Sequence, residues 1–282
     1  MACSLSAIIH SHHQLSNGAL KSSYRHLLEQ PDLVDQLIIL TDEQWQDLQQ
    51  EGFPATQMAV IPNHLDNGNI PANPQKVPSQ TVIYLARYSE EKQHALLLSA
   101  FRKVLAVIPD AQLHTYGVGP LRRSLSAQVA EWGLAQAIHI NGFTSDIAQA
   151  HKTACCTVLC STQEGQSISA VEAMAYGTPL ISFAIKYGPR DILQDRQAGM
   201  LVPCGDEEAL AAALIKVIAD KTLQQSMRQA ALCNAQRYYA SAIAEHWAAW
   251  LQASERLMAA QAKADFGLAS KSPQIGRASG RE

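Results

Sequence analysis

The sequence lacks the surplus of positive charge that a protein needs to hold nucleic acid or an anionic membrane. Its 22 lysines and arginines face 25 aspartates and glutamates, which gives a formal net charge of −3. No apolar run approaches the ~18 residues that span a bilayer, and the start of the chain has no basic signal-peptide region. We expect no nucleic-acid partner and no transmembrane segment, and any anion site must be local.

The sequence also lacks a Cys-x-x-Cys pair and any internal repeat. Of its six cysteines, Cys155, Cys156 and Cys160 share one apolar run and the others are scattered. Buried cysteine behaves as a small hydrophobe, so reduced thiols are favoured over a disulfide framework or a metal site. We therefore expect a cytoplasmic location.

What the sequence does contain is a regular alternation of strand-like and helix-like segments. The predicted strands cover residues 81–86, 112–116, 138–141, 155–160, 179–182 and 199–202. The predicted helices between them cover residues 94–107, 120–132, 146–153 and 167–176. This alternation predicts an α/β fold, a doubly wound parallel sheet of Rossmann-like type over residues 80–240. Such sheets bind ligands at the carboxyl ends of their strands.

The flanking regions are less regular. Residues 1–62 show a βαβαβ pattern that is too short for an independent doubly wound domain, so we expect a partial N-terminal α/β segment. Residues 63–79 are rich in proline and asparagine and indicate a linker. Residues 241–262 predict a C-terminal amphipathic helix that crosses back to the N-terminal part, and residues 263–282 predict a disordered tail.

The densest chemical signal is a pair of glutamates eight residues apart. Glu164 lies in a predicted strand-to-helix loop and Glu172 lies inside the helix. Gly165 would let a ligand approach the backbone, and the free amides at the helix start would favour an anion. Those amides belong to Gln166, Ser167 and Ile168.

This glutamate pair also has an ordinary explanation. Ser169 and Glu172 have the spacing of a capping box, and Glu164 would then be a solvated loop charge. The spacing of the residues alone favours neither explanation.

Four weaker signals sit in other loops. Arg87 and Lys92 follow the first strand of the domain, where two cations could converge on one group or form a solvated cluster with the neighbouring glutamates. Two glycines follow the second strand, and a tight strand-to-helix turn explains them as well as a ligand-binding turn does. An Asn-Gly-Phe sequence follows the third strand. Near the start, His10 begins a His-x-His-His motif without the further ligand that zinc needs, so an ordinary polar loop is the main alternative.

With Glu164, Glu172, Gly177 and Pro179 in place, the sequence resembles the GT4-type retaining glycosyltransferases, whose signature is Glu-x7-Glu followed by Gly-x-Pro. Tyr187-Gly-Pro is similar to the subgroup of poly(glycerol-phosphate) α-glucosyltransferases and serine-rich-adhesin glycosyltransferases. The resemblance implies a two-domain GT-B fold. It also implies transfer of a hexose, glucose or N-acetylglucosamine, from a UDP-sugar with retained configuration to a cell-surface polymer or protein such as wall teichoic acid.

The resemblance assigns a role to each of the residues named above. Arg87 and Lys92 would stabilise the departing diphosphate, and Glu164 and the following amides would hold the donor sugar. Glu172 would accept the ribose hydroxyls. The nucleotide would enter at a Gly-x-Gly turn and the base at the Asn-Gly-Phe loop, with a histidine near the donor sugar. These remaining residues are Gly117, Gly119, Asn141, Phe143 and His10.

The sequence contains no Asp-x-Asp motif, so we expect neither a metal nor another cofactor. A full GT-B enzyme has a complete first domain, and we expect that a chain without most of it binds donor but transfers poorly. An incompletely covered C-terminal helix could then drive self-association. Two other functions stay open: a non-catalytic nucleotide-sugar-binding remnant, and a GT-B-type nucleotide-sugar epimerase.

Overall fold

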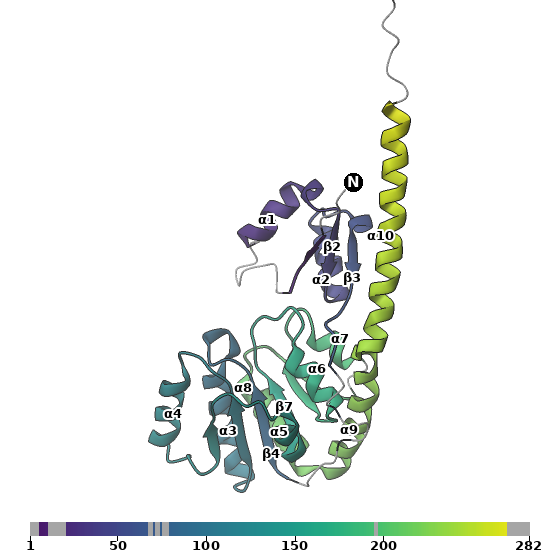
Figure 1. Cartoon of the computed structure of the whole chain (residues 1–282). Coiled ribbons are helices and arrows are strands. Elements are labelled where there is room, and N and C mark those ends of the chain that lie inside the picture. Colours follow the sequence, from purple (N-terminus) through teal and green to yellow (C-terminus); the bar gives the residue numbers. More distant parts are fainter. Residues whose placement is uncertain are drawn as a thin grey trace, which may run out of the picture.

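The structure is a computed structural model that describes residues 6–10, 21–66, 70, 74, 79–194 and 197–269. It consists of two parallel-sheet layers, a small N-terminal one and a larger one, joined along one side by a long helix (Figure 1). The second and third histidines of the N-terminal motif, most of the predicted linker and residues 270–282 lie outside the described residues.

The N-terminal segment is a three-stranded parallel sheet in the order β1-β2-β3. Its strands are β1 (Ser6–Ile8), β2 (Gln36–Ile39) and β3 (Met58–Val60), and its helices are α1 (Ser22–Glu29) and α2 (Asp42–Gln50). Successive strand residues point to opposite faces, so Leu37 and Ile39 pack against α1 and α2 while Ile38 faces the other side.

The larger domain is built on a six-stranded, entirely parallel sheet in the order β6-β5-β4-β7-β8-β9. The strands are β4 (Thr81–Leu85), β5 (Gln112–Tyr116), β6 (Ile138–Ile140), β7 (Ala154–Leu159), β8 (Leu180–Phe183) and β9 (Gly199–Val202). This is the doubly wound order in which the chain starts in the middle and winds outward in both directions. The predicted α/β class is confirmed.

Helices connect and cover the strands of this sheet. They are α3 (His94–Val107), α4 (Arg122–Glu131), α5 (Ile147–Thr153), α6 (Ile168–Ala175), α7 (Pro189–Leu193), α8 (Glu207–Ala219) and α9 (Lys221–Ala235). Burial is deepest at the centre, where all six residues of β7 are buried. The short helix α7 was not predicted, because five residues are too few to show a helical period.

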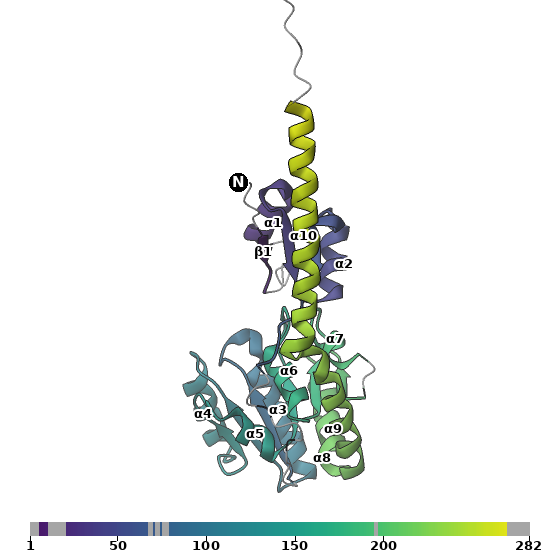
Figure 2. The same cartoon turned by 45° about the vertical axis from the view of Figure 1, so that its right-hand side comes forward.

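Helix α10 (Ala240–Ala269) returns from the larger domain and runs along the N-terminal sheet (Figure 2). Ile243, Trp247 and Trp250 pack on the face that carries Ile38 and Ile61. The helix continues through Ala269, past the predicted end of the C-terminal helix at residue 262. Among the described residues, none of the helices has the length and apolar character needed to span a membrane.

Candidate functional site

The two central strands of the large sheet mark the place where a ligand is expected. The strand order reverses between β4 and β7, and in doubly wound sheets the crevice outside the carboxyl ends at such a point is the usual binding site. The loop after β4 carries Arg87 and Lys92, and the loop after β7 carries Glu164. The topology therefore brings together residues that are more than 70 positions apart in the chain.

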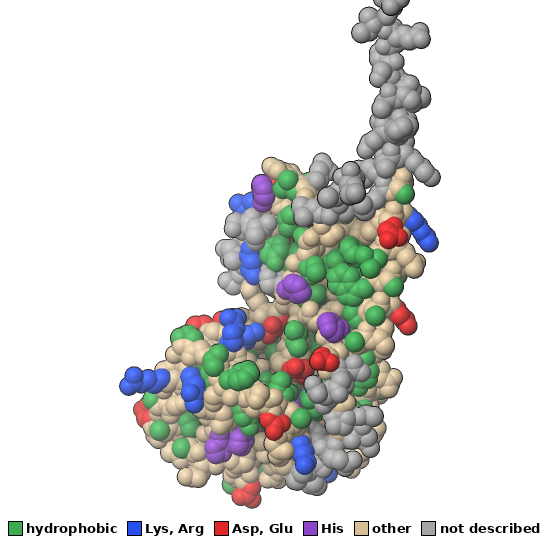
Figure 3. All heavy atoms as spheres, viewed as in Figure 1, with side chains coloured by type: hydrophobic (Ala, Val, Ile, Leu, Met, Phe, Trp, Pro, Cys, Tyr) green, Lys and Arg blue, Asp and Glu red, His purple; other side chains and the backbone are tan. Residues whose placement is uncertain are grey.

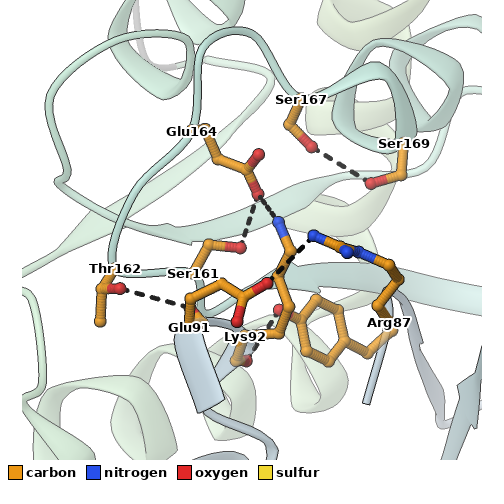
Figure 4. Close-up of polar contacts among 9 residues, drawn as sticks. Arg87, Glu91, Lys92, Ser161, Thr162, Glu164, Ser167 and Ser169 are labelled. Carbon is orange, nitrogen blue, oxygen red and sulfur yellow. Dashed lines mark hydrogen bonds and ion pairs between the residues drawn. The ribbon is translucent and has the colours of Figure 1, made fainter. Parts of the chain in front are cut away.

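An ion pair joins the two loops. Lys92 Nζ lies 2.6 Å from Glu164 Oε1, and both side chains are only 14% exposed. Ser161 Oγ donates to the same carboxylate oxygen at 2.6 Å. The backbone supports this pair, because Thr162 N donates to Glu91 O at 2.9 Å and the Tyr84 hydroxyl donates to Lys92 O at 2.9 Å. Lys92, the predicted diphosphate-binding cation, and Glu164, the predicted sugar-binding carboxylate, thus form an ion pair with each other (Figure 4).

Arg87 is the more exposed of the two cations. Its guanidinium donates to Glu91 Oε1 at 3.1 Å, and its side chain is 72% exposed. Figure 4 draws its head group beside the Lys92 amine, on the side of Ser167 and Ser169. A long, exposed arginine of this kind can leave its surface partner at little cost and turn to a ligand.

The start of α6 lies next to this pair, and the first N–H groups of a helix have no partner within the helix itself. Ser167 is the N-cap residue of α6, and its side chain makes no capping hydrogen bond. Its hydroxyl instead lies 3.2 Å from the hydroxyl of Ser169. Because the helix begins at Ile168, Ser169 lies inside its first turn, and the capping-box explanation of Ser169 and Glu172 is wrong.

Glu172 lies half-buried one turn further along α6, and its carboxylate makes no hydrogen bond or ion pair with the described residues. Burial raises the pKa of this carboxyl above its usual value. A half-buried carboxylate without a partner is costly unless a ligand or water supplies donors. Its position therefore suits the predicted contact with two ribose hydroxyls.

The Gly-x-Gly turn packs directly on the loop that carries Arg87. A Cβ on Gly117 would lie 2.0 Å from Ala86 O, and one on Gly119 would lie 2.4 Å from Tyr88 O. Both glycines also have positive φ angles, of 158° and 153°. Close approach of two backbones therefore requires glycine here, which gives both positions a packing reason beside their predicted role in binding the nucleotide.

Exposed apolar side chains line the same edge of the sheet. Phe143 after β6 is 76% exposed, Val118 after β5 is 58% exposed and Ile168 at the start of α6 is 51% exposed. Asn141 points back, with its amide donating to His139 O at 3.4 Å. Phe143 is thus free to stack on a base, whereas the Asn141 side chain is turned toward its own strand.

A buried histidine lies directly behind Lys92. His94 is 1% exposed and its ring lies 4.7 Å, between centroids, from the rings of both Tyr84 and Tyr88. Burial, followed by the nearby charge of Lys92, lowers the pKa of His94 to about 4. The histidine is therefore neutral at physiological pH, and the positive charge of the site comes from Lys92 and Arg87.

Comparison with known proteins identifies this arrangement. The chain matches the profile of the family described as "Glycosyl transferases group 1" over residues 68–232, more than half of its length. The chain belongs to this family. The predicted family resemblance is thereby confirmed, and it includes the predicted subgroup of teichoic-acid and protein glycosyltransferases.

Three similar proteins show the range of the group 1 relatives. An exopolysaccharide phosphotransferase of Streptomyces coelicolor is 30% identical over 78% of this chain and 24% of its own length. The poly(glycerol-phosphate) alpha-glucosyltransferase of Bacillus subtilis is 25% identical over 95% of this chain and 40% of its own length. The chain therefore spans less than half the length of both curated relatives.

The third is a solved structure, the pneumococcal O-GlcNAc transferase GtfA in complex with UDP and GlcNAc. It superposes with a TM-score of 0.78 and 23% identity, covering 90% of this chain and 53% of that protein. The likeness confirms the predicted GT-B type of fold.

One predicted site residue, His10, is not joined to the Lys92–Glu164 pair. His10, at the end of β1, is exposed and makes no hydrogen bond or ion pair with Lys92 or Glu164 within the described residues. No group of three or more His, Cys, Asp or Glu that could hold a metal ion occurs in the described part of the chain.

The sequence prediction missed the side chains whose hydrogen bonds fix the backbone and side chains of the site. Tyr88 is fully buried, and its hydroxyl lies 2.9 Å from Thr115 O and 2.7 Å from Asn141 O, so it joins the ends of three strands. Ser161 and Tyr84 hold Glu164 and Lys92 in the same way. The only sequence signal for them is their place at the carboxyl ends of predicted strands.

A second group of missed contacts joins the large domain to the N-terminal segment. Tyr187 is fully buried with a φ angle of 62°, and its hydroxyl donates to Asp47 Oδ2 at 2.7 Å. Its amide donates to Glu43 Oε2 at 3.0 Å, and Lys186 Nζ lies 2.5 Å from the same Asp47 oxygen. The Tyr-Gly-Pro segment that marks the subgroup therefore lies at the interface between the two parts.

Proposed function

We propose that the chain transfers a hexose, glucose or N-acetylglucosamine, from a UDP-sugar to a cell-surface polymer or protein acceptor such as wall teichoic acid, with retention of configuration. The observation that carries the proposal is the Lys92–Glu164 pair at the strand-order reversal, beside the uncapped start of α6. These groups match a donor that combines a diphosphate with a hydroxyl-rich sugar.

The residues have complementary tasks in this reaction. The amides at the start of α6, together with Lys92 and Arg87, would bind the diphosphate and stabilise the charge that builds up on it as the sugar departs. Glu172 would hold the ribose and Phe143 would stack on the base. Glu164 would accept hydroxyl hydrogen bonds from the sugar once Lys92 turns toward the diphosphate.

Retention would follow from the side on which the acceptor attacks. We assign no protein nucleophile, so the oxocarbenium-like charge on the sugar would form against the departing diphosphate, and the acceptor hydroxyl would enter on the same face. In this scheme the diphosphate needs no metal ion, because two cations and a helix N-terminus already face it. His10, two residues after β1 of the N-terminal sheet, would approach the sugar from the N-terminal part.

The acceptor and the setting rest on the relatives. A poly(glycerol-phosphate) alpha-glucosyltransferase and a peptide N-acetylglucosaminyltransferase subunit are both similar to this chain, which supports a polymer or protein acceptor. The surface is notched between the two parts, and both basic and acidic side chains lie on the lower rim of the notch (Figure 3). None of the five described cysteines forms a disulfide, which fits the cytoplasm.

A product assay tests this proposal. The chain is incubated with UDP-glucose or UDP-N-acetylglucosamine and a poly(glycerol-phosphate) acceptor, and UDP release and the anomeric configuration of the product are followed by NMR. We expect slow, acceptor-dependent UDP release and an α-linked product. UDP binding without release would instead support a non-catalytic binding protein, and acceptor-independent release of UDP and free sugar would support an epimerase-like reaction.

A further inference from the structure

One side chain of the loop between β7 and α6, here the donor loop, is bonded to the segment that leaves the N-terminal sheet at Asn63, here the hinge. Gln166 follows Glu164 by two residues, and its side chain is 6% exposed. Its Oε1 accepts a hydrogen bond from the backbone N–H of Asn63 at 2.7 Å, across 103 residues of sequence. Asn63 leaves the N-terminal sheet just after β3, so this bond joins the donor loop directly to the segment that connects the two parts.

The Asn63 amide has a local reason to need this partner. Ile61 N still pairs with Ile39 O at 2.8 Å, which extends the ladder of the N-terminal sheet by one residue. Pro62 has no N–H, so Asn63 carries the next backbone donor, beyond the end of the sheet. The Gln166 oxygen satisfies it where no strand can.

A second connection runs in parallel through the Tyr187 loop. A Cβ on Gly188 would lie 3.4 Å from Gln166 Cα, which shows how closely this loop packs behind the donor loop. The neighbouring Tyr187 is the residue bonded to Asp47 and Glu43 on α2. The backbone at Gln166 is therefore linked to the N-terminal segment on both sides, through Asn63 and through α2.

We propose that Gln166 is a positioning residue that couples the donor loop to the orientation of the N-terminal segment. In this view, a UDP-sugar that engages Glu164 and the following amides also fixes the hinge at Asn63, and with it the face of the N-terminal sheet that approaches the sugar. The inference rests on the proposed function, since it concerns the same loop. It assigns the Gln166 side chain to the hinge, while the Gln166 backbone amide stays available to the ligand.

Two substitutions separate this role from others. Gln166→Leu keeps much of the volume but removes the acceptor oxygen, and Gln166→Glu keeps an acceptor oxygen. Gln44→Leu is the matched control, because Gln44 is also a buried glutamine whose Oε1 accepts a backbone N–H, from Leu40 at 3.4 Å, but within the N-terminal segment.

Hydrogen exchange at the Asn63 amide tests the contact itself, without any ligand. We expect Gln166→Leu to speed exchange at this amide by about 10-fold or more, and both Gln166→Glu and the Gln44→Leu control to leave it near the wild-type rate. In the wild type, a bound UDP-sugar should slow the exchange further. Unchanged exchange in Gln166→Leu, or no response of the wild-type amide to a UDP-sugar that does bind, overturns the proposal.

Steady-state kinetics of UDP-sugar turnover test the consequence. We expect Gln166→Leu to lower kcat by about 10-fold with KM and UDP affinity changed less than about twofold, and Gln166→Glu to restore kcat. A parallel loss of UDP affinity would mean that the side chain contacts the ligand, and would overturn the positioning role. If the wild type binds no UDP, the proposed function fails, but the ligand-free exchange comparison still decides whether Gln166 holds the hinge.

Discussion

The donor edge of the large sheet and the interface with the N-terminal segment are both rich in charge, but they use it differently. At the interface, Asp47 accepts hydrogen bonds from Lys186 and Tyr187, and Glu43 accepts one from the Tyr187 amide. At the donor edge, α6 starts without a side-chain cap, and the Glu172 carboxylate makes no hydrogen bond or ion pair with the described residues. The interface groups named here are paired, although Asp191 Oδ2 at the same interface is buried without a hydrogen-bond partner among the described residues. At the donor edge, the Glu172 carboxylate is the group left unpaired.

This contrast has an energetic reason. A buried polar group that stays without a partner destabilises the fold by about 1–3 kcal/mol, so a chain retains such groups where a ligand completes them. Substitutions at the donor edge should therefore change binding more than stability, and substitutions at the interface should do the reverse.

The largest expected effect is at Lys92. Lys92→Met removes the cation and leaves the half-buried Glu164 carboxylate without its ion pair, so we expect UDP affinity to fall about 100-fold, or about 2.7 kcal/mol. Lys103→Met is the matched control, because Lys103 pairs with Glu207 on the surface at 2.8 Å, away from the site. Calorimetric titration measures both, and a loss of less than threefold in Lys92→Met contradicts the assignment.

Tyr187 tests the interface side of the comparison. Tyr187→Phe removes one hydrogen bond to a carboxylate, and we expect the free energy of unfolding to fall by about 1–3 kcal/mol while UDP affinity changes less than about twofold. Denaturant titration measures the first and calorimetry the second. Tyr239→Phe is the control, since the Tyr239 hydroxyl makes no hydrogen bond within the described part of the chain. A large loss of UDP affinity in Tyr187→Phe would erase the distinction between the two regions.

Glu172 should show opposite effects on binding and stability. Burial raises its folded pKa, so its contribution to folding is present below the unfolded pKa and is lost as the pH rises through the folded pKa. At neutral pH the charged carboxyl thus opposes folding. We expect Glu172→Gln to raise the Tm at pH 7 and to weaken UDP binding by about 10-fold. A lower Tm together with unchanged UDP affinity would show that the carboxyl supports the fold instead.

Asp191, in α7, gives the smallest effect and a test by pH. Burial, followed by the charges of Asp42 and Glu43 on α2, raises its pKa to about 6, while Arg237 acts in the opposite direction. Its stabilising contribution is present below the unfolded pKa and is lost as the pH rises through about 6.

We therefore expect Asp191→Asn to stabilise the chain at pH 7.5 by on the order of 1 kcal/mol, less than the full pKa shift because the carboxyl is partly exposed. No gain should be seen near pH 4. Denaturant titrations at the two pH values measure the difference, and an equal effect at both would exclude titration as its cause.

Much of the large domain could be predicted because its signals are local. The strand at residues 112–116 and the helix at 94–107 have the predicted bounds, since apolar runs and helical period depend only on neighbouring residues. Helix α10 continues past residue 262, where the prediction ended it. The sequence did not indicate this extension, because the residues after 262 show no apolar period. The sequence also predicted that Glu164 and Lys92 lie at the carboxyl edge of the sheet, because each follows a predicted parallel strand.

The contacts between the two parts could not be predicted in this way. The Gln166 bond to Asn63 and the Tyr187 bond to Asp47 span 103 and 140 residues, and nothing in the local sequence marks either pair. The ion pair between Lys92 and Glu164 was missed for the same reason, although both residues were identified. Local patterns show which groups reach an edge, but the packing of the two parts decides which of them meet.

Calorimetric titration of the wild-type chain with UDP, UMP and glucose tests the central claim most directly. The account places the strongest contacts on the diphosphate and the ribose, so it predicts that UDP binds more tightly than UMP and that both bind more tightly than glucose. Absence of UDP binding, or equal affinity for UDP and glucose, would contradict the assignment of this edge as a nucleotide-sugar donor site.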